Sequence, residues 1–245
     1  MMGCRLQAGE DFATPVGNPK LVEAVNATLG QGCDQDLELA KDLRDGAVRR
    51  MNVSLRVLGC GEGGITGAIA CLSDVTDAAE LREELARLAT YDSLTGCLSR
   101  RAVLEQLGTL TAAGAPVTVL FVDLDGFKDV NDRHGHAAGD ALLLHVGACL
   151  QAGLTPGEIV GRLGGDEFLI ATTRPDHDSE VAAIADATAK AVGQPLLFAG
   201  LHLTARASIG AARSTGVTDA DMLVAAADAV MYRTKTERRA TRRSS

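Results

Sequence analysis

Two adjacent acids, Asp166 and Glu167, directly follow two adjacent glycines, Gly164 and Gly165. Apolar runs lie on both sides, which is typical of two strands joined by a tight turn, because glycine reaches positive φ without steric cost. Two carboxylates on one turn repel each other unless a cation lies between them. The pattern predicts either a cation-binding hairpin tip that a large ligand can approach or an acidic turn in solvent, and both interpretations stay open here.

A second carboxylate pair, Asp123 and Asp125, ends the apolar run at 117–122. Residues two apart on a strand share a face, so these two side chains should project together. Apolar runs that end in paired carboxylates are common where metal ions are held, and hard oxygen ligands favour Mg²⁺. His134 and His136 follow closely, but the abundance of carboxylates favours a structural role for at least one of them.

The elements that must position these acids follow from hydrophobic periodicity. Ser99 is the expected N-cap of a helix that runs to about Ala113. Gly126 to Lys128 should form a turn, and the next long helix should begin after Gly139 and Asp140. The remaining pattern predicts a strand at 117–122, a short helical piece at 129–132, strands around the glycine pair, a helix at 176–192, a hairpin of strands 196–198 and 202–211, and a last helix at 219–236.

The first third of the chain predicts a small α+β segment. After residues 1–20, which show little periodicity, we expect a helix at 21–29 and strands at 36–40, 50–58 and 65–72, with turns at 45–46 and 59–64. This order, ending in Asp74-Val75-Thr76, resembles the C-terminal part of a PAS sensory domain. The resemblance implies a partial PAS-like segment over residues 1–76, and a small sheet for dimer contact is the alternative.

Leu81, Leu85 and Leu88 follow at four-then-three spacing, with charged residues around them. This spacing predicts the seam of a short coiled coil in a linker helix at 77–90. Fewer than three heptads are present, so the segment would dimerise weakly by itself. A surface helix that packs on its own domain is the alternative.

The composition limits the class of protein. The chain has 245 residues, a net charge of −8 and 3% aromatic residues, which fits one or two domains with an aliphatic core. The acidic balance argues against nucleic acid or anionic membranes as partners, so metal ions and a few placed cations would have to attract a polyphosphate. The six cysteines form no C-x-x-C pair. With no membrane span or signal peptide visible, we expect a soluble cytoplasmic protein.

Residues 91–240 resemble the GGDEF family of diguanylate cyclases, with a basic tail at 241–245. Several motifs carry the resemblance in order: DSLTG at 92–96, FVDLDGFKDVND at 121–132, HGHAAGD at 134–140, RLGGDEF at 162–168, ASIGAA at 207–212 and ADAVMYRTK at 227–235. The resemblance implies an α+β fold with an antiparallel-rich central sheet flanked by helices, similar to the palm of nucleotide polymerases and adenylyl cyclases.

The resemblance also implies an activity. The family joins two GTP into cyclic di-GMP and releases two pyrophosphates by two-metal phosphoryl transfer. One site holds one GTP, so closing the ring needs two facing sites in a symmetric homodimer. Two Mg²⁺ per site are implied, and Mn²⁺ is the expected substitute.

The roles of individual residues are carried over on the matching motifs. The implied metal ligands are Asp123, Asp166 and the carbonyl of Leu124. The implied catalytic residues are Asp166, favoured over Glu167 for assisting removal of the 3′-hydroxyl proton, and Lys128, which would stabilise the transition state. The implied substrate-binding residues are Gly126, Phe127, Gly164 and Gly165 at the backbone, Lys235 and Arg239 for the phosphates, Asn131 and Asp140 for the guanine edge, and His136 as a pocket wall.

Two departures from the family pattern stand out. Thr155, Pro156, Gly157 and Glu158 occupy the positions of the R-x-x-D motif that forms the family's inhibitory product site. The arginine that would grip the product is missing, so we expect no strong product inhibition through this site. Around Arg239 the chain has Glu237, Arg238 and Ala240, where a glycine and an asparagine normally flank the arginine of the family's closing motif.

Two other functions compete with an active cyclase. A non-catalytic GGDEF signalling module would bind GTP or a partner protein, but such modules usually lose an acid that this chain keeps. Another two-metal nucleotidyl transferase of the palm type is the third hypothesis. The implied guanine-reading pair, Asn131 and Asp140, argues against it.

Overall fold

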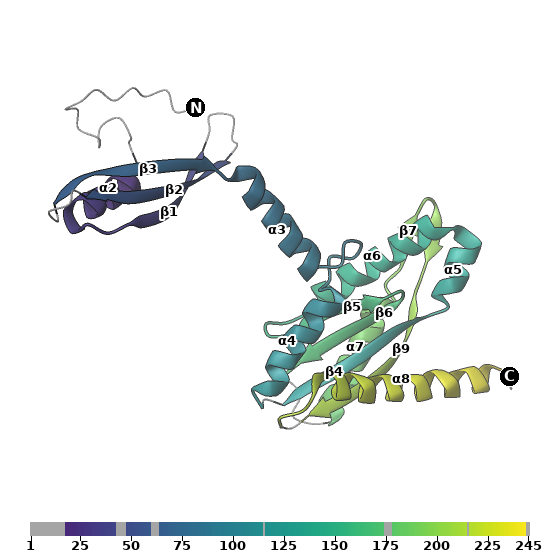
Figure 1. Ribbon diagram of the computed structural model, residues 1–245. Helices are drawn as coiled ribbons and strands as arrows, with labels where there is room; N and C mark the ends of the chain where they lie inside the picture. Colours follow the sequence, from purple (N-terminus) through teal and green to yellow (C-terminus); the bar gives the residue numbers. More distant parts are fainter. Residues whose placement is uncertain are drawn as a thin grey trace. The chain divides into compact units, whose positions relative to one another are not determined.

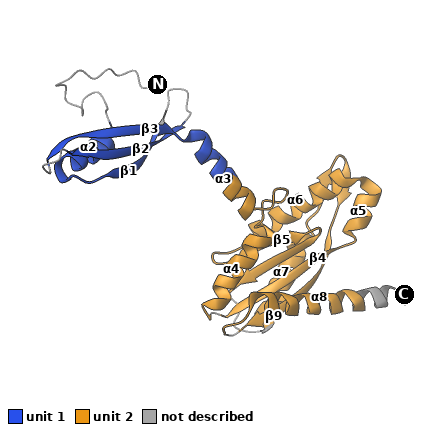
Figure 2. Cartoon of the chain, in the orientation of Figure 1, with its two compact units in different colours: residues 1–84 blue, residues 85–245 orange. Residues whose placement is uncertain are grey.

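The computed structural model describes residues 18–42, 48–59, 64–114, 116–173, 178–214 and 216–243 (Figure 1). These residues form two compact units, 1–84 and 85–245, each with its own hydrophobic core (Figure 2). The turn expected at 45–46 and most of the one expected at 59–64 lie outside the described residues. No helix in the described ranges combines the length and apolar character needed to cross a membrane.

The first unit is one helix on a three-stranded antiparallel sheet. Helix α2 (Pro19–Gln31) begins at Asn18, whose side chain accepts hydrogen bonds from the first N–H groups of the helix. The strands are β1 (Gln35–Asp42), β2 (Val48–Gly59) and β3 (Ile65–Asp74), in the order β1-β2-β3. Leu21, Leu39, Val53 and Leu55 form the core. The helix and the three strands expected from the sequence are confirmed.

Helix α3 (Thr76–Thr90) follows β3 and matches the expected linker helix. The side chains of Leu81, Leu85 and Leu88 are 60%, 57% and 47% exposed. The stripe is therefore not buried against the described part of the chain, as packing on its own domain would require. Ala79 is the only described residue of α3 that is buried.

The second unit is built on a four-stranded antiparallel sheet in the order β5-β6-β4-β9. The strands are β4 (Val117–Asp125), β5 (Ile159–Gly164), β6 (Glu167–Thr172) and β9 (Arg206–Ser214). The helices are α4 (Arg100–Ala112), α5 (Phe127–His134), α6 (His136–Ala152), α7 (Asp178–Val192) and α8 (Ala220–Arg243).

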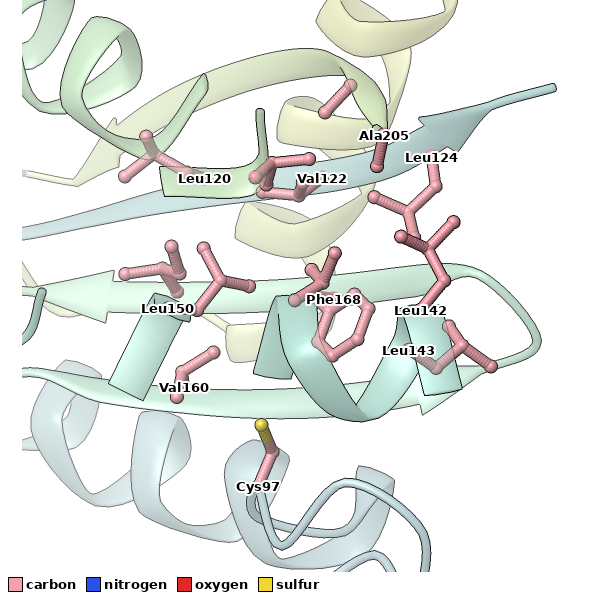
Figure 3. Packing of buried hydrophobic residues seen from close by; sticks show 14 of the residues in the cluster. Cys97, Leu120, Val122, Leu124, Leu142, Leu143, Leu150, Val160, Phe168 and Ala205 are labelled. Carbon is pink, nitrogen blue, oxygen red and sulfur yellow. The ribbon is translucent and has the colours of Figure 1, made fainter. Parts of the chain in front are cut away.

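Helices cover both faces of this sheet, which explains why β4 is a continuous apolar run. Leu120, Val122 and Leu124 of β4 belong to the core that includes residues of α6 and α7 (Figure 3). The alternate residues Val117, Val119 and Phe121 belong to the core formed with α4 and α8. The α+β class expected for this part of the chain is therefore confirmed.

Three expected helix boundaries are wrong. Helix α8 ends at Arg243 and not at 236, so the helix continues into the expected basic tail. Helix α5 begins at Phe127, so Phe127 and Lys128 lie in its first turn and not in a loop. Helix α6 begins at His136, so Gly139 and Asp140 lie within it. The break between the helices is at Gly135, whose φ of 82° suits glycine. Gly139 lies inside the helix, where the absence of a Cβ gives room to the side chain of Asn131.

The second expected hairpin is also only partly correct. Strand β7 (Leu196–Phe198) pairs with β8 (Leu201–Leu203) through a turn at Ala199 and Gly200, as expected. The strand expected at 202–211 is divided, because β8 ends at Leu203 and β9 begins at Arg206 in the main sheet. Leu203 and Ala205 are buried in the core near α7, so the chain changes sheets where it passes over that core.

Candidate active site

The glycine pair forms the hairpin turn that the sequence predicted. Gly164 pairs with Glu167 across the turn, and a register shift between Arg162 and Gly164 marks a β-bulge at Leu163. Gly164 and Gly165 have φ of 145° and 52°, which favour glycine at both positions. The carbonyl of the next residue, Asp166, accepts a hydrogen bond from the Leu124 N–H at 3.1 Å. The turn is thereby held against the end of β4.

Three carboxylates gather at this end of the sheet. Asp123 on β4 lies directly opposite Glu167 on β6, and Asp166 lies in the adjoining turn. Burial, followed by the charge of Asp123, raises the pKa of Asp166 above its usual range, against the lowering effect of Lys235 and Arg162. Burial and the charges of Asp123, Asp166 and Asp228 raise the pKa of Glu167. The solvated-turn interpretation does not fit this partly buried acidic cluster.

Lys235 reaches this cluster from α8. Leu223, Ala227 and Met231 are buried on one stripe of the helix, and Lys235 follows one turn later on the same face. A Cβ at Gly210 of β9 would lie 2.1 Å from the Met231 nitrogen, so the helix backbone lies directly on the strand. The Nζ of Lys235 donates to the carboxylate of Asp123. Lys235 was expected to bind phosphate, and the motifs gave no indication of its contact with Asp123.

The start of α5 lies beside the same end of β4. Gly126, with φ of 74°, turns the chain from β4 into the helix. N–H groups in a first helical turn have no partner within the helix and can donate to an anion. The backbone N–H of Phe127, which was expected to donate to phosphate together with that of Gly126, lies in this first turn. The Lys128 side chain is exposed.

The residues expected to read guanine lie where α5 meets α6. A Cβ at Gly139 would lie 1.9 Å from the Asn131 Oδ1, so the Asn131 side chain rests on the backbone of α6. Asp140, the next residue, is exposed. His136 is exposed as well and is the first residue of α6. The structure thus brings Asn131 next to the turn of α6 that carries Asp140.

A groove of about 1280 Å³ opens between α5, α8 and the start of β9. Its lining residues are Asp125, Gly126, Asp129, Val130, Arg133, His134, Gly193, Thr204, Ala205, Arg206, Thr234, Lys235 and Glu237. Asp125 accepts a hydrogen bond from the Ser208 hydroxyl at 2.9 Å. Gly126 and Lys235, which the sequence analysis assigned to phosphate, therefore share one groove.

The fit of a metal rests on the donor set. In the described ranges, no group of three or more His, Cys, Asp or Glu is arranged to hold a metal ion. The oxygens of Asp123 and Asp166 and the carbonyl of Leu124 nevertheless lie at one end of the sheet, and they are the hard donors that Mg²⁺ prefers. The mutual charge of the acids also favours a cation between them. The residues therefore fit Mg²⁺.

Three further residues, Arg239, Asp92 and Arg162, concern the site. Arg239 lies in the last turns of α8, and its side chain lies outside the described residues. Asp92 and Arg162, which were not among the expected site residues, form an ion pair next to the glycine turn. Both belong to motifs that were quoted for the resemblance, but they are 70 positions apart. No local pattern could therefore have paired them.

The segment at 155–158 closes on itself. The backbone N–H and the hydroxyl of Thr155 both donate to the Glu158 carboxylate, at 2.7 and 3.0 Å. The Glu158 N–H donates to the Thr155 carbonyl at 3.0 Å. Thr155, which was expected to take the place of the family's product-binding arginine, thus forms its hydrogen bonds within this loop.

Comparison with known proteins gives a family for the second unit. The family model "Diguanylate cyclase, GGDEF domain" matches residues 89–241. An uncharacterized signaling protein of Caulobacter vibrioides is 31% identical over 239 residues, which is 93% of this chain and 29% of that protein. Diguanylate cyclase DgcP of Escherichia coli is 35% identical over 171 residues, 66% of this chain and 50% of DgcP.

A solved structure agrees with this. The coiled coil and GGDEF domain of DgcB from Caulobacter crescentus, in complex with c-di-GMP, matches with a TM-score of 0.61 and 26% identity, covering 66% of this chain and 89% of that one. The chain spans half or less of the length of the first three curated relatives that it matches.

Proposed function

The chain belongs to the GGDEF family of diguanylate cyclases, and on that premise we propose that it condenses two GTP into cyclic di-GMP and two pyrophosphates. The observation that carries the proposal is the cluster of Asp123, Asp166 and Glu167, with Lys235 in contact with Asp123. Lys235 also lines a groove of about 1280 Å³ beside this cluster.

The reaction is a pair of equivalent displacements. The 3′-hydroxyl of each GTP attacks the α-phosphate of the other GTP, a P–O bond forms, and pyrophosphate leaves. Asp166 takes the hydroxyl proton in this proposal, with Glu167 as the alternative acceptor. Lys128 would neutralise charge that develops on the phosphate in the transition state. Its exposed position leaves its side chain free to reach substrate.

Asp123, Asp166 and the Leu124 carbonyl are the proposed ligands of two Mg²⁺, which Mn²⁺ can replace. Mg²⁺, when bound, offsets the charge of the triphosphate and of the leaving pyrophosphate. The family's metal dependence and the oxygen donors at this end of β4 support this assignment.

Substrate recognition would be divided between the two ends of α5. At the start of the helix, the N–H groups of Phe127 and Lys128 and the backbone of Gly126 would bind phosphate, together with Lys235 and Arg239. Near its end, Asn131 and Asp140 would read the guanine edge, because a carboxylate accepts from the N1–H and N2–H of guanine and adenine lacks these donors. Gly164 and Gly165 leave room for the nucleotide at the hairpin turn.

Ring closure requires two sites that face each other, so we propose that the active species is a symmetric homodimer. The exposed leucine stripe of α3 supports this proposal. The PAS-like assignment of residues 1–76 remains a proposal about the origin of the input signal.

A second function is a module that binds GTP or a partner without catalysis. It is favoured by one observation, namely that Asp123, which should hold a metal, is in contact with Lys235. In this case Lys235 would replace the cation and keep the acids neutralised.

The deciding experiment incubates the purified protein with GTP and Mg²⁺ and separates the products by chromatography. The matched variants are Asp166→Ala and Asp186→Ala, the latter an exposed acid on α7 outside the site. We expect cyclic di-GMP from the parent and from Asp186→Ala, and none from Asp166→Ala. GTP binding without product in the parent would support the second function.

A further inference from the structure

The Arg162 side chain joins two parts of the second unit that are far apart in sequence. Its Nη1 donates to both carboxylate oxygens of Asp92, at 3.1 and 3.3 Å. Its Nε and Nη2 both donate to the Gly165 carbonyl, at 3.1 and 2.7 Å. All three guanidinium nitrogens are thus engaged, and the side chain is only 14% exposed.

The hydrogen bonds from Arg162 to the Gly165 carbonyl matter for the site because this carbonyl belongs to the peptide unit that leads into Asp166. A peptide unit is planar, so holding its carbonyl also holds the nitrogen of the next residue. The peptide unit on the other side of Asp166 is held by the Leu124 N–H, which donates to the Asp166 carbonyl at 3.1 Å. Both peptide units that flank Asp166 are therefore fixed, although the turn contains two flexible glycines.

At its other end, Arg162 holds a segment that is fastened to the last turn of α3. The Asp92 carboxylate accepts from the N–H and the hydroxyl of Thr95, at 2.9 and 2.7 Å. The N–H of Ser99 donates to the Thr90 carbonyl, and its hydroxyl to the Ala89 carbonyl, each at 2.8 Å. The connecting segment from Asp92 to Ser99 is thereby closed onto the helix end.

The same segment is also paired with the edge of the main sheet. The Leu98 N–H donates to the Val160 carbonyl at 3.0 Å, and the Arg162 N–H donates to the Leu98 carbonyl at 2.9 Å. A continuous set of hydrogen bonds therefore leads from the end of α3 to the turn that carries Asp166.

We propose that Arg162 is a positioning residue that fixes the Asp166 turn and, through Asp92, fastens it to the end of α3. This inference rests on the proposed function, since Asp166 is its proposed proton acceptor and metal ligand. Because α3 also carries the exposed leucine stripe, the same hydrogen bonds connect the proposed dimer contact to the catalytic turn.

The kinetic test compares Arg162→Ala, Arg162→Lys and Asp92→Asn with Arg101→Ala, an exposed arginine that pairs with Glu105 on α4. Misplacing a reacting group by about 1 Å can cost about 100-fold, so we expect kcat of Arg162→Ala to fall about 10- to 100-fold. The KM for GTP should change by less than about threefold, because Arg162 does not line the nucleotide groove.

The other variants separate the two contacts of Arg162. Arg162→Lys should lie between the parent and Arg162→Ala, because the three N–H donors of lysine are on one nitrogen and cannot span both partners as the planar guanidinium does. Asp92→Asn keeps an oxygen acceptor for Thr95 but loses the ion pair, and it should lower kcat as well. An Arg162→Ala variant with kcat within about twofold of the parent, or a change in KM alone, would overturn the positioning role. Unchanged kcat in Asp92→Asn would overturn the fastening to α3.

Hydrogen exchange gives a readout that does not depend on activity. We expect the Leu124 amide, which donates to Asp166, to exchange faster in Arg162→Ala and to be unchanged in Arg101→Ala. Equal exchange in all variants would refute the inference. If the parent makes no cyclic di-GMP, the proposed function fails, and the exchange result still decides the role of Arg162. If Arg162→Ala does not fold, Arg162→Lys and Asp92→Asn decide it.

Discussion

At the scale of single residues, glycine decides how closely the parts of the site approach. Gly210 brings the backbone of α8 onto β9, since a Cβ there would lie 2.1 Å from the Met231 nitrogen and 2.2 Å from the Ala227 carbonyl. Gly139 gives room to the Asn131 side chain in the same way. Both glycines therefore position residues that the proposed function needs, Lys235 in the first case and Asn131 in the second.

We expect Gly210→Ala to destabilise the second unit by about 1–3 kcal/mol, because the added methyl group meets backbone atoms that cannot move separately from the helix. It should also raise the KM for GTP, since Lys235 moves with α8. Urea denaturation measures the first effect and initial rates the second. The matched control is Gly108→Ala on α4, where nothing lies within 4 Å of the added Cβ. This control should be neutral or slightly stabilising, and an equal loss in both variants would contradict the explanation.

Asp92 predicts a pH dependence of stability. Although burial raises the pKa of its carboxyl group, hydrogen bonds from Thr95 and Arg162 outweigh this effect and lower the pKa below its usual value. A lowered folded-state pKa stabilises the protein above the unfolded-state pKa of about 3.9, and this contribution is lost as the pH falls through the folded-state pKa.

The stability difference between the parent and Asp92→Asn should therefore be largest near neutral pH and shrink below about pH 4. Urea denaturation at several pH values measures it, with Asp186→Asn as the control for loss of one exposed acid. A difference that stays constant down to low pH would show that the Asp92 charge contributes nothing.

At the scale of elements, the second unit positions its site by bringing several elements together at one end of the sheet. Strand β4 supplies Asp123 and Leu124, the turn between β5 and β6 supplies Asp166, and α8 supplies Lys235. Helix α3 differs from these elements, because its leucines are exposed and pack into no hydrophobic core of the described chain. Its apolar stripe is explained if a second copy covers it.

The α3 stripe predicts that Leu85→Glu weakens self-association by about tenfold or more, because a charge in an apolar seam is left desolvated. Analytical ultracentrifugation with and without GTP measures this. Arg82→Ala, at an exposed position on the same helix, is the matched control and should associate like the parent. Association that survives Leu85→Glu would place the dimer contact elsewhere.

At the scale of the whole molecule, one helix connects a small α+β unit to a unit of the GGDEF family along the chain. We expect regulation through α3, because the segment at 155–158, which is expected to match the family's product site, contains no arginine. Thr155 and Glu158 instead hydrogen-bond to each other.

We expect micromolar cyclic di-GMP to cause no non-competitive inhibition of the parent with respect to GTP. Initial rates at several concentrations of GTP and product measure this. The double variant Thr155→Arg, Glu158→Asp restores the family motif and should gain such inhibition. Non-competitive inhibition of the parent would show that another site binds the product.

The sequence by itself determined most of the local elements and the family motifs that name the candidate site residues. Periodicity placed β4 and the glycine hairpin, and the motifs placed Asp123, Asp166 and Asn131 in one family pattern. It failed at the start of α6, because Gly139 looks like a helix break when the Asn131 side chain beside it is unknown. The apolar run at 202–211 also predicted one strand where the structure has β8 and β9, since such a run does not show where a chain changes sheets.

Only the tertiary structure decided which distant residues meet. Lys235 and Asp123 are 112 positions apart, and Arg162 and Asp92 are 70 apart. Their contacts depend on the strand order β5-β6-β4-β9 and on the approach of α8 to Gly210. Hydrophobic periodicity shows which face of an element is buried, but it does not say against what, and for that reason these two ion pairs could not be predicted from the sequence.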